Sequence, residues 1–595
     1  MIRNVYYGII IIFGIIHKYG LESYGLLMYI FSRIGENERR TSVKAIDRRE
    51  IIIRLLSVVV LLSISAAACG PRDSTDQKTG EKQTAKKESA VPLFLTAVED
   101  VTDTVDFQRT TIYYTIATNV FNRLVEMEAD RDGNIHIVPS LAKSWEISPD
   151  KKEYSFHLRE NVSFSNGAAL TAEDVLYSFS RLLTLPGSTS REIAEGIMGA
   201  RKLEEGETDV LEGFRILDDL DFVITLEEPY AAFLACLSMP AASIMDSGTT
   251  REAGDRFGME PEWTIGTGPY ILREWEAEKG MILVANENCW AGPPCNDGLD
   301  LRFLTEPEDV RQLFEKGQMD IIDLDDVGDS AEFFIHGDIY QDRLFKTQRI
   351  GIAYIALNES IKPLDNVEVR KALQLSLNRT VLLEAVYGGR GFIENGIYPH
   401  ALYGFSRSLP EIPYDPEEAG RLLRQAGYPD GFDLTITMNA SATENEMTLM
   451  RLAASMWEKI GIRAFIKVLG EKEFMHLRKT GGLAVYTGLW TADYNDPENF
   501  IYTFFGNRDN TTYRSLCYPR EEIMERVRAA RTITDEAERL REYQELERII
   551  VQEDAAWIPL FSRWRYYVTS ERVEGIRSSW NGSVKNEYRN ISIKE

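Results

Sequence analysis

Carboxylates at short spacing are the residues of this chain that could carry chemistry. Asp323, Asp325 and Asp326 form one cluster, and Asp493 and Asp496 form another. Paired carboxylates can act as general acid and general base, so the clusters suggest a secreted hydrolase as one hypothesis. The chain has 93 Asp and Glu residues, and in such a chain clusters of this kind also arise by chance. Spacing alone therefore does not establish a catalytic pair.

The other common catalytic and metal-binding motifs are missing from the sequence. No Gly-x-Ser-x-Gly, His-Glu-x-x-His or phosphate-loop pattern occurs, and there is no Cys-x-x-Cys pair. The chain has only six His residues, which makes a His-rich metal site improbable. We therefore expect no metal and no cofactor, and a binding protein is favoured over an enzyme.

Cys69 ends a segment that is typical of exported lipoproteins. Leu55 to Ala68 is a largely apolar run of 14 residues, preceded by Arg48, Arg49 and Arg54. A basic region, a short apolar run and small residues before a cut form a secretory signal, and a membrane span needs ~20 residues. A Cys directly after the small residues resembles a lipoprotein signal, which implies that Cys69 is lipidated and anchors the protein to a membrane. The alternative is an ordinary signal peptide with a chance Cys.

Composition describes the rest of the N-terminal region and limits the partners. Residues 1–68 are predicted to be an upstream segment plus a signal peptide, and the polar residues 69–90 a disordered tether. The formal net charge of -26 argues against nucleic acid as a partner, since phosphate contacts need a basic face. Export also permits disulfides, and Cys289 and Cys295 flank a turn-rich loop where a local bridge is reasonable. Cys236 and Cys517 are expected to be buried free thiols.

From residue 91 onward, strand-like runs alternate with amphipathic helices, as in an α/β or α+β protein. Thr171 and Asp174 resemble a capping box that opens a helix. Apolar residues at four-residue spacing predict one helix over residues 367–383. A long amphipathic helix is predicted over residues 535–553, with Thr534 as its N-cap. The four spaced residues of the helix over residues 367–383 are Val369, Leu373, Leu377 and Val381.

Several short motifs follow one another in a fixed order between about residues 91 and 576. They are Pro139-Ser140-Leu141-Ala142-Lys143-Ser144-Trp145, Asn166-Gly167, Thr171-Ala172-Glu173-Asp174, Gly266-Thr267-Gly268-Pro269-Tyr270, Asp320-Ile321, Asn378-Arg379, Tyr428-Pro429-Asp430-Gly431 and Trp490-Thr491-Ala492-Asp493-Tyr494-Asn495-Asp496-Pro497. In order and spacing these motifs resemble the extracytoplasmic binding proteins of bacterial ABC importers, the oligopeptide, dipeptide and nickel family. Many independent positions agree, which makes the resemblance specific.

The resemblance implies an α/β fold of the periplasmic-binding-protein type. Two lobes would close around a ligand, and an extra subdomain would be inserted into them. Residues 91–125, 239–348 and 558–595 would form lobe I. Residues 126–238 would form the inserted subdomain, lobe II, and residues 349–557 would form lobe III.

The same resemblance implies the residues that contact the ligand. Asp493 matches an aspartate that binds the ammonium group of a peptide, and a buried ammonium needs such a partner. Trp490 matches an aromatic residue of the cleft, and Thr491 and Ala492 would offer backbone groups. Arg478 aligns with a basic residue that takes the ligand carboxylate in some oligopeptide binders.

The function implied by the resemblance is capture, without catalysis. A monomeric lipoprotein on the periplasmic or extracytoplasmic face would bind short peptides and deliver them to the permease subunits of an ABC transporter. One alternative keeps the fold but binds a dipeptide, haem, a nickel chelate or another amine-bearing solute, and Asp493 favours a ligand with a free ammonium. The second alternative is the hydrolase with paired carboxylates.

Overall fold

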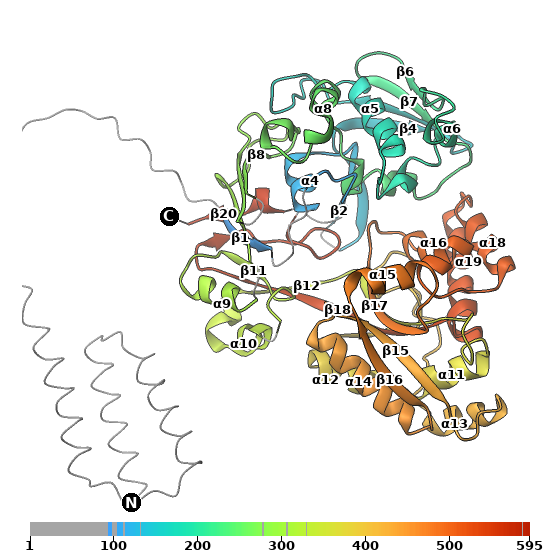
Figure 1. Ribbon diagram of the computed structural model, residues 1–595. Coiled ribbons are helices and arrows are strands. Elements are labelled where there is room, and N and C mark those ends of the chain that lie inside the picture. The colour runs from blue at the N-terminus through green and yellow to red at the C-terminus, as the bar shows by residue number, and fades with distance from the viewer. Residues whose placement is uncertain are drawn as a thin grey trace, which may run out of the picture. The chain divides into compact units, whose positions relative to one another are not determined.

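Figure 1 shows the computed structural model of the chain. It describes residues 93–97, 104–110, 114–130, 133–276, 279–304, 307–328, 330–585 and 587–594. The predicted signal peptide, the predicted tether and Cys69 lie outside these ranges. Within these ranges, no helix is both long enough and apolar enough to cross a membrane.

Helices and short helical turns connect the sheets of the fold. The helices are α4 (Tyr114–Val120), α5 (Ala172–Thr184), α6 (Ala200–Glu204), α7 (Phe233–Cys236), α8 (Ser247–Ala253), α9 (Pro307–Glu315), α10 (Ser330–His336), α11 (Val367–Leu375), α12 (Arg379–Tyr387), α13 (Pro416–Gln425), α14 (Glu444–Glu458), α15 (Glu471–Lys479), α16 (Glu498–Phe505), α17 (Arg508–Tyr513), α18 (Glu521–Ala530) and α19 (Glu536–Arg548). The short turns are η1 (Arg191–Ile193), η2 (Pro240–Ala242), η3 (Gly254–Arg256), η4 (Pro261–Trp263), η5 (Asp338–Arg343), η6 (Ile549–Glu553) and η7 (Tyr588–Asn590). Two short strands, β19 (Val573–Glu574) and β20 (Ser592–Ile593), pair near the C-terminus.

The first sheet combines strands that are far apart in the sequence. Its order is β1 (Leu93–Ala97), β10 (Gly298–Phe303), β9 (Gly280–Ala285) and β8 (Tyr270–Glu276). β1 and β10 are parallel, and the other neighbours are antiparallel. Phe121, Leu272 and Leu301 lie in its core together with Tyr567 and Tyr588 from the C-terminal segment. The end of the chain therefore returns to the sheet that β1 begins (Figure 1).

The second sheet is antiparallel and has its own core. Its order is β4 (Ala142–Ile147), β5 (Glu153–Leu158), β7 (Asp221–Thr225) and β6 (Phe214–Ile216), and the hairpin of β2 (Val125–Ala129) and β3 (Ile135–Pro139) precedes it. Val175 and Phe179 of α5 lie in one core with Phe156 of β5. The carboxylate of Asp174 accepts a hydrogen bond from the Thr171 N–H at 2.9 Å, which confirms the predicted helix start.

The third sheet is mixed and has helices on both faces. Its order is β11 (Ile321–Asp323), β18 (Trp557–Thr569), β13 (Gly351–Leu357), β17 (Val485–Thr491), β15 (Asp433–Asn439) and β16 (Arg463–Leu469), with β12 (Leu344–Gln348) and β14 (Gly391–Ile393) also paired to β18. Every residue of β13 is buried. Ile352 and Tyr354 lie in the core with α15, α16, α18 and α19, whereas Ala353 and Ile355 lie in the core with α11, α12, α13 and α14 (Figure 1). Such two-sided burial explains the continuous apolar run of β13.

Strand β18 links the third sheet to the first. Its first half pairs with β13 and β14, and its second half pairs with β12 and β11. Tyr567 of the second half lies in the core of the first sheet. The predicted boundary between lobe III and lobe I, at residues 557 and 558, falls at the start of this strand. One continuous strand therefore pairs with strands from both predicted lobes. The division into three lobes stays a prediction.

Two predicted helices differ from the structure at their ends. The prediction of one helix over residues 367–383 is wrong, because α11 ends at Leu375 and α12 begins at Arg379. The side-chain oxygen of Asn378 accepts a hydrogen bond from the Val381 N–H at 3.0 Å and caps a new helix there. The prediction of Thr534 as an N-cap is also wrong, because the Asp535 carboxylate caps α19. The helix predicted to end at residue 553 changes at Arg548 into the π-turn η6.

The four cysteines of the described residues are free thiols, so the local disulfide suggested by the sequence is not formed. Cys289 is buried, with its sulfur 3.9 Å from the Thr267 carbonyl oxygen, whereas Cys295 is exposed. The first thiol thus packs inward and the second lies on the surface. Cys236 is buried as predicted, and Cys517 is half-buried.

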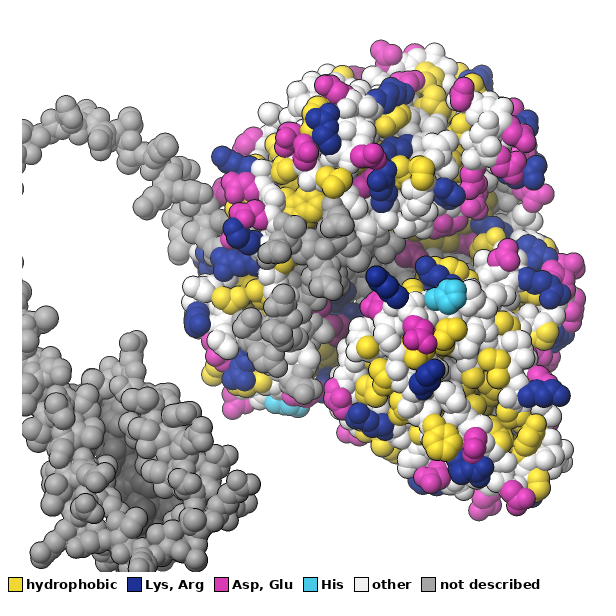
Figure 2. Space-filling view, in the orientation of Figure 1, with side chains coloured by type: hydrophobic (Ala, Val, Ile, Leu, Met, Phe, Trp, Pro, Cys, Tyr) yellow, Lys and Arg dark blue, Asp and Glu magenta, His cyan; other side chains and the backbone are white. Residues whose placement is uncertain are grey.

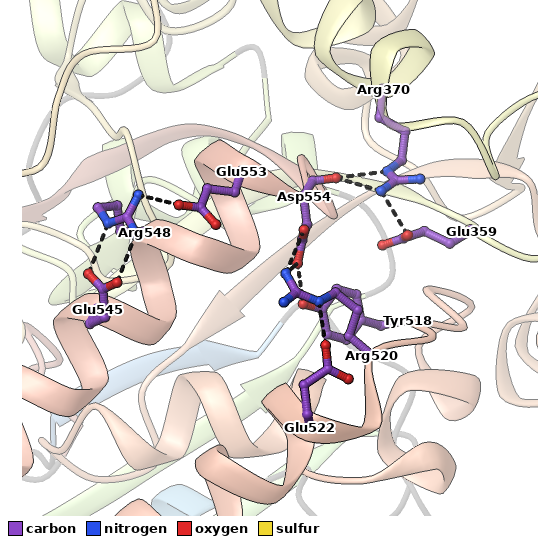
Figure 3. A network of polar contacts seen from close by, with 9 residues as sticks. All are labelled: Glu359, Arg370, Tyr518, Arg520, Glu522, Glu545, Arg548, Glu553 and Asp554. Atoms are coloured by element: carbon purple, nitrogen blue, oxygen red, sulfur yellow. Dashed lines mark hydrogen bonds and ion pairs between the residues drawn. The ribbon is translucent and has the colours of Figure 1, made fainter.

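A polar network holds the end of η6 against α11 (Figure 3). Arg370 donates two hydrogen bonds to the carbonyl oxygen of Asp554, at 3.0 and 2.6 Å. It also forms an ion pair with Glu359 at 2.8 Å. The Asp554 carboxylate accepts hydrogen bonds from Arg520 and from the Tyr518 hydroxyl. The network therefore joins α11, the turn after η6 and the segment before α18.

Glu547 of α19 gives the stability of the fold a pH dependence. It is buried, and its Oε1 accepts hydrogen bonds from the backbone N–H groups of Ile397 and Tyr398 at 2.6 and 2.9 Å. Burial outweighs these bonds and raises the pKa of Glu547 to about 8. A glutamate in the unfolded chain has a pKa of about 4.3. The stability that comes from protonated Glu547 is therefore complete below the unfolded-state pKa of about 4.3 and is lost as the pH rises toward 8.

We expect the unfolding free energy of Glu547→Gln to fall less steeply with pH than that of the wild type. The slopes should differ by up to about 1.4 kcal/mol per pH unit between pH ~5 and ~8, measured by urea unfolding. Glu545→Gln is the matched control, because Glu545 is exposed on the same helix and its bond to Arg548 lowers its pKa. This control should keep the wild-type slope. Equal slopes in the wild type and Glu547→Gln would contradict the assignment.

Candidate functional site

Asp493 lies just after β17 and is held by one amide side chain. Asn499 of α16 donates a hydrogen bond from Nδ2 to Oδ2 of Asp493 at 3.1 Å and accepts one from the Asp493 N–H at 3.1 Å. Within the part of the chain that the structure describes, no Lys or Arg forms an ion pair with Asp493. Burial raises the pKa of Asp493, while the Asn499 bond and the charge of Arg514 act in the opposite direction. Among the described residues, the site is thus a fixed carboxylate that forms no ion pair with Lys or Arg.

Two side chains from distant segments lie near this carboxylate. Tyr114 comes from α4 and Glu192 from η1. Desolvation of its carboxyl, together with the negative charge of Asp493, raises the pKa of Glu192 to about 7, although the residue keeps an exposed surface. Burial, followed by the charge of Asp493, also raises the pKa of Tyr114 well above its usual range. Three segments thus meet at a region of negative potential, which suits a cation.

The other residues predicted from the same motif lie beside Asp493. The indole Nε1 of Trp490 donates to Oδ1 of Asn499 at 3.3 Å, so this amide connects Trp490 with Asp493. Thr491 is the last residue of β17 and pairs with Gly351 of β13. The N–H of buried Ala492 donates to the carbonyl oxygen of Ile350 at 2.8 Å. Of the backbone groups of Ala492, only the carbonyl therefore remains for a ligand.

Arg478 lies in the last turn of α15, and the structure places a second arginine near it. The guanidinium carbons of Arg478 and Arg514 are 5.7 and 5.4 Å from the ring centroid of Tyr513. Arg514 is also 4.7 Å from the ring of Trp490. Sequence analysis missed Arg514, and it missed Tyr114 and Glu192. None of the three belongs to a motif, and only the folded chain brings them to Asp493.

Three of the five carboxylates that suggested catalysis, Asp323, Asp325 and Asp496, pair with arginines. Asp496 accepts two hydrogen bonds from Arg539, at 2.9 and 2.7 Å, and caps the start of α16. Asp323 pairs with Arg565, and Asp325 pairs with Arg349. Among the described residues, no group of three His, Cys, Asp or Glu side chains could hold a metal ion. These ion pairs give the clusters a structural role.

A pocket of about 380 Å³ lies close to Asp496, between the second sheet and the helices of the third. Figure 2 shows a hollow between these parts, with hydrophobic side chains inside it. The hairpin β2–β3 contributes Ile135 and Ile137, and the opposite wall includes Tyr403 and Glu536. Asp493 is not among the lining residues, so the pocket and the Asp493 site are separate features.

A comparison with protein families decides the identity of the fold. Residues 136–512 match the family of bacterial extracellular solute-binding proteins, family 5. The chain belongs to this family. The family 5 fold accounts for the mixed sheets described above, and its members bind solutes outside the cytoplasm.

Individual family 5 relatives match almost over their whole length. Heme-binding protein A of Haemophilus influenzae is 28% identical over 526 residues, which cover 86% of this chain and 94% of the relative. The dipeptide-binding protein of Escherichia coli is 27% identical over 520 residues, with 82% and 91% covered. A periplasmic binding protein from Helicobacter pylori, solved with the peptide STSA, superposes with a TM-score of 0.69 at 23% identity and covers 85% and 98% of the two chains. The chain therefore has the fold of a periplasmic binding protein.

Proposed function

We propose that this protein captures short peptides with a free amino terminus and delivers them to an ABC transporter permease. The carboxylate of Asp493 is the observation that carries the proposal. It is half-buried and fixed by Asn499, and no Lys or Arg of the described residues pairs with it. A peptide ammonium would supply the missing charge, and a charge-assisted hydrogen bond in a closed cleft is a strong one.

The relatives support a peptide ligand. The Escherichia coli relative is named as a dipeptide-binding protein, and the Helicobacter pylori structure contains a peptide. Backbone pairing with strand ends such as that of β17 would give affinity without strict sequence selection. Trp490, Thr491, the carbonyl of Ala492 and Arg478 are the further contacts in this proposal.

The Haemophilus influenzae relative favours haem as a second candidate ligand. Haem brings two propionates and a large apolar ring, and it has no ammonium. A fixed carboxylate beside Glu192 would repel propionates, so the charge around Asp493 supports a peptide over haem. A nickel chelate gains no support from the described residues, which hold no group of metal-binding side chains.

The proposal includes lipid attachment to a membrane on its periplasmic or extracytoplasmic face. Cys69 would carry the lipid, and residues 69–90 would tether a monomeric binding unit that catalyses no reaction. Labelling of the mature protein with a radioactive fatty acid, compared between the wild type and Cys69→Ala, tests the anchor. Equal labelling of both proteins would contradict lipidation at Cys69.

The bound ligand can be identified directly. We expect native mass spectrometry of the protein, purified without denaturant, to reveal a mixture of short peptides. A single mass that matches haem would keep the solute-binding role and replace the ligand. A protein that carries no ligand and shows no thermal shift with peptide mixtures would overturn peptide capture.

A further inference from the structure

Tyr494 directly follows Asp493 in the chain, but its side chain packs in the core of a different sheet. It is 5% exposed and lies in the core of the second sheet, although β17 and α16 on either side of it pack in a core of the third. The contact joins the second-sheet part, residues 125–238, to the third-sheet part, residues 349–557. Ile135 of β3 also packs against both cores. The two parts thus meet directly beside the proposed ammonium site.

Tyr230 of the second-sheet part binds charged groups of the third-sheet part. Its hydroxyl donates a hydrogen bond to Oε2 of Glu498 at 3.0 Å, and the Tyr494 hydroxyl donates to the same oxygen. Arg531 forms an ion pair with Oε1 of Glu498 at 2.9 Å, and its guanidinium carbon is 4.6 Å from the centroid of the Tyr230 ring. The N–H of Ala231 donates to the carbonyl oxygen of Arg531 at 3.3 Å. These contacts form a latch between the two parts, which consists of the side chains of Tyr230, Tyr494, Glu498 and Arg531.

The hydroxyl groups of the latch keep their protons. Burial raises the pKa of Tyr230 and of Tyr494 well above the usual range, so both act as donors. The Cys236 sulfur is 3.2 Å from the Tyr230 oxygen, and burial also raises the pKa of this thiol, so its S–H is available to donate to that oxygen. The Glu498 carboxylate, which is 2% exposed, thus receives two hydroxyl donors and one guanidinium. Separation of the two parts would remove the Tyr230 donor from this buried charge.

The latch and the Asp493 site share the same short stretches of backbone. Asp493 and Tyr494 are consecutive residues, and so are Glu498 and Asn499 of α16. Asn499 holds the Asp493 carboxylate, and Glu498 holds the Tyr494 hydroxyl. A displacement of Tyr494 from the second-sheet core would therefore also move Asp493.

Like charges oppose the joining of the two parts when no ligand is present. Glu192 of η1 belongs to the second-sheet part, and the negative charges of Asp493 and Glu498 help to raise its pKa. The latch therefore holds negative groups of both parts near one another. A ligand ammonium at Asp493 would offset this repulsion and so favour the joined state.

From these contacts we infer that the latch closes the second-sheet part onto the third-sheet part when the cation of a ligand binds Asp493. The inference rests on the proposed function and adds the device that retains the ligand. Without a ligand the latch opens and closes, and the bound ammonium shifts this equilibrium toward the closed state. Release of the ligand then requires the bond between Tyr230 and Glu498 to break, so the latch sets how long the ligand stays bound.

Hydrogen–deuterium exchange of the Ala231 amide reports directly on the latch, because its acceptor, the carbonyl oxygen of Arg531, lies on the other part. The full-length protein is stripped of ligand and measured with and without saturating Ala-Leu. We expect Ala-Leu to slow the exchange of Ala231 in the wild type about 10-fold, while the amides of β5 keep their rates. Tyr230→Phe without ligand should exchange at Ala231 about 10-fold faster than the wild type. It should also bind Ala-Leu about 10-fold more weakly in calorimetric titration.

A second variant and a control separate the latch from the fold. Tyr494→Leu removes the ring from the second-sheet core, keeps Asp493, and should speed the exchange of Ala231 more than Tyr230→Phe does. Tyr177→Phe is the matched control, because Tyr177 also belongs to the second-sheet part and its ring contacts Arg251 of α8 instead, at 4.5 Å. This control should keep the wild-type exchange and affinity, and thermal melting should show that all variants are folded.

The outcomes distinguish failure of the latch from failure of peptide capture. Wild-type exchange of Ala231 in both folded latch variants would overturn the latch, and peptide capture would stand if the wild type still bound Ala-Leu. If Ala-Leu bound without slowing the exchange of Ala231, the coupling between ligand and latch would be wrong. If the wild type did not bind Ala-Leu, the proposed function would fail, whereas faster exchange in the two variants would still support the latch.

Discussion

Replacing Asp493 by Asn is expected to weaken the binding of peptides with a free amino terminus by on the order of 100-fold. The substitution keeps the size of the side chain and its contact with Asn499 but removes the charge that would neutralise a buried ammonium. The measurement is calorimetric titration with a dipeptide and its N-acetylated form.

The acetylated dipeptide provides the internal control for this effect. It should bind the wild type and Asp493→Asn with the same low affinity, because it brings no ammonium to the site. Asp509→Asn, an exposed change in the first turn of α17, should leave both affinities unchanged. Equal binding of the free and acetylated dipeptides to the wild type would remove Asp493 from the ammonium site.

Local signals in the sequence predicted much of the fold. The capping box at Thr171 depends only on neighbouring residues of the chain, and it is present. The break at Asn378 was missed because the apolar spacing continues through it. Val381, the last residue of that pattern, is 47% exposed and belongs to a second helix. A side chain that caps a backbone group can thus outweigh hydrophobic periodicity.

The candidate site could be predicted only where it lies in one continuous segment. Trp490, Thr491, Ala492 and Asp493 follow one another, so a motif was enough to select them. Glu192 of η1 is far from Asp493 in the chain, and Arg514 follows α17, so their proximity to Asp493 depends on how these elements pack. Periodicity and spacing carry no information about such packing, which is why Arg514 emerged only from the folded structure.

Replacing Arg370 by Met is expected to lower the unfolding free energy by about 3–5 kcal/mol. The Arg370 and Glu359 side chains are each 4% exposed, and Arg370 also donates to the carbonyl oxygens of Leu364 and Asp554 (Figure 3). Met fills a similar volume but leaves these buried acceptors without donors. Urea unfolding at neutral pH measures the loss.

An exposed ion pair of the same chemistry provides the comparison. Arg421 and Glu418 of α13 pair across one helical turn, with side chains that are 47% and 36% exposed. Arg421→Met should leave the unfolding free energy nearly unchanged, because water replaces the lost partner. Glu359→Gln should cost less than Arg370→Met, because a glutamine side-chain oxygen can still accept a hydrogen bond from Arg370, whereas Arg370→Met removes every donor. If Arg370→Met and Arg421→Met lost similar amounts of unfolding free energy, the buried acceptors around Arg370 would not be what stabilises this network.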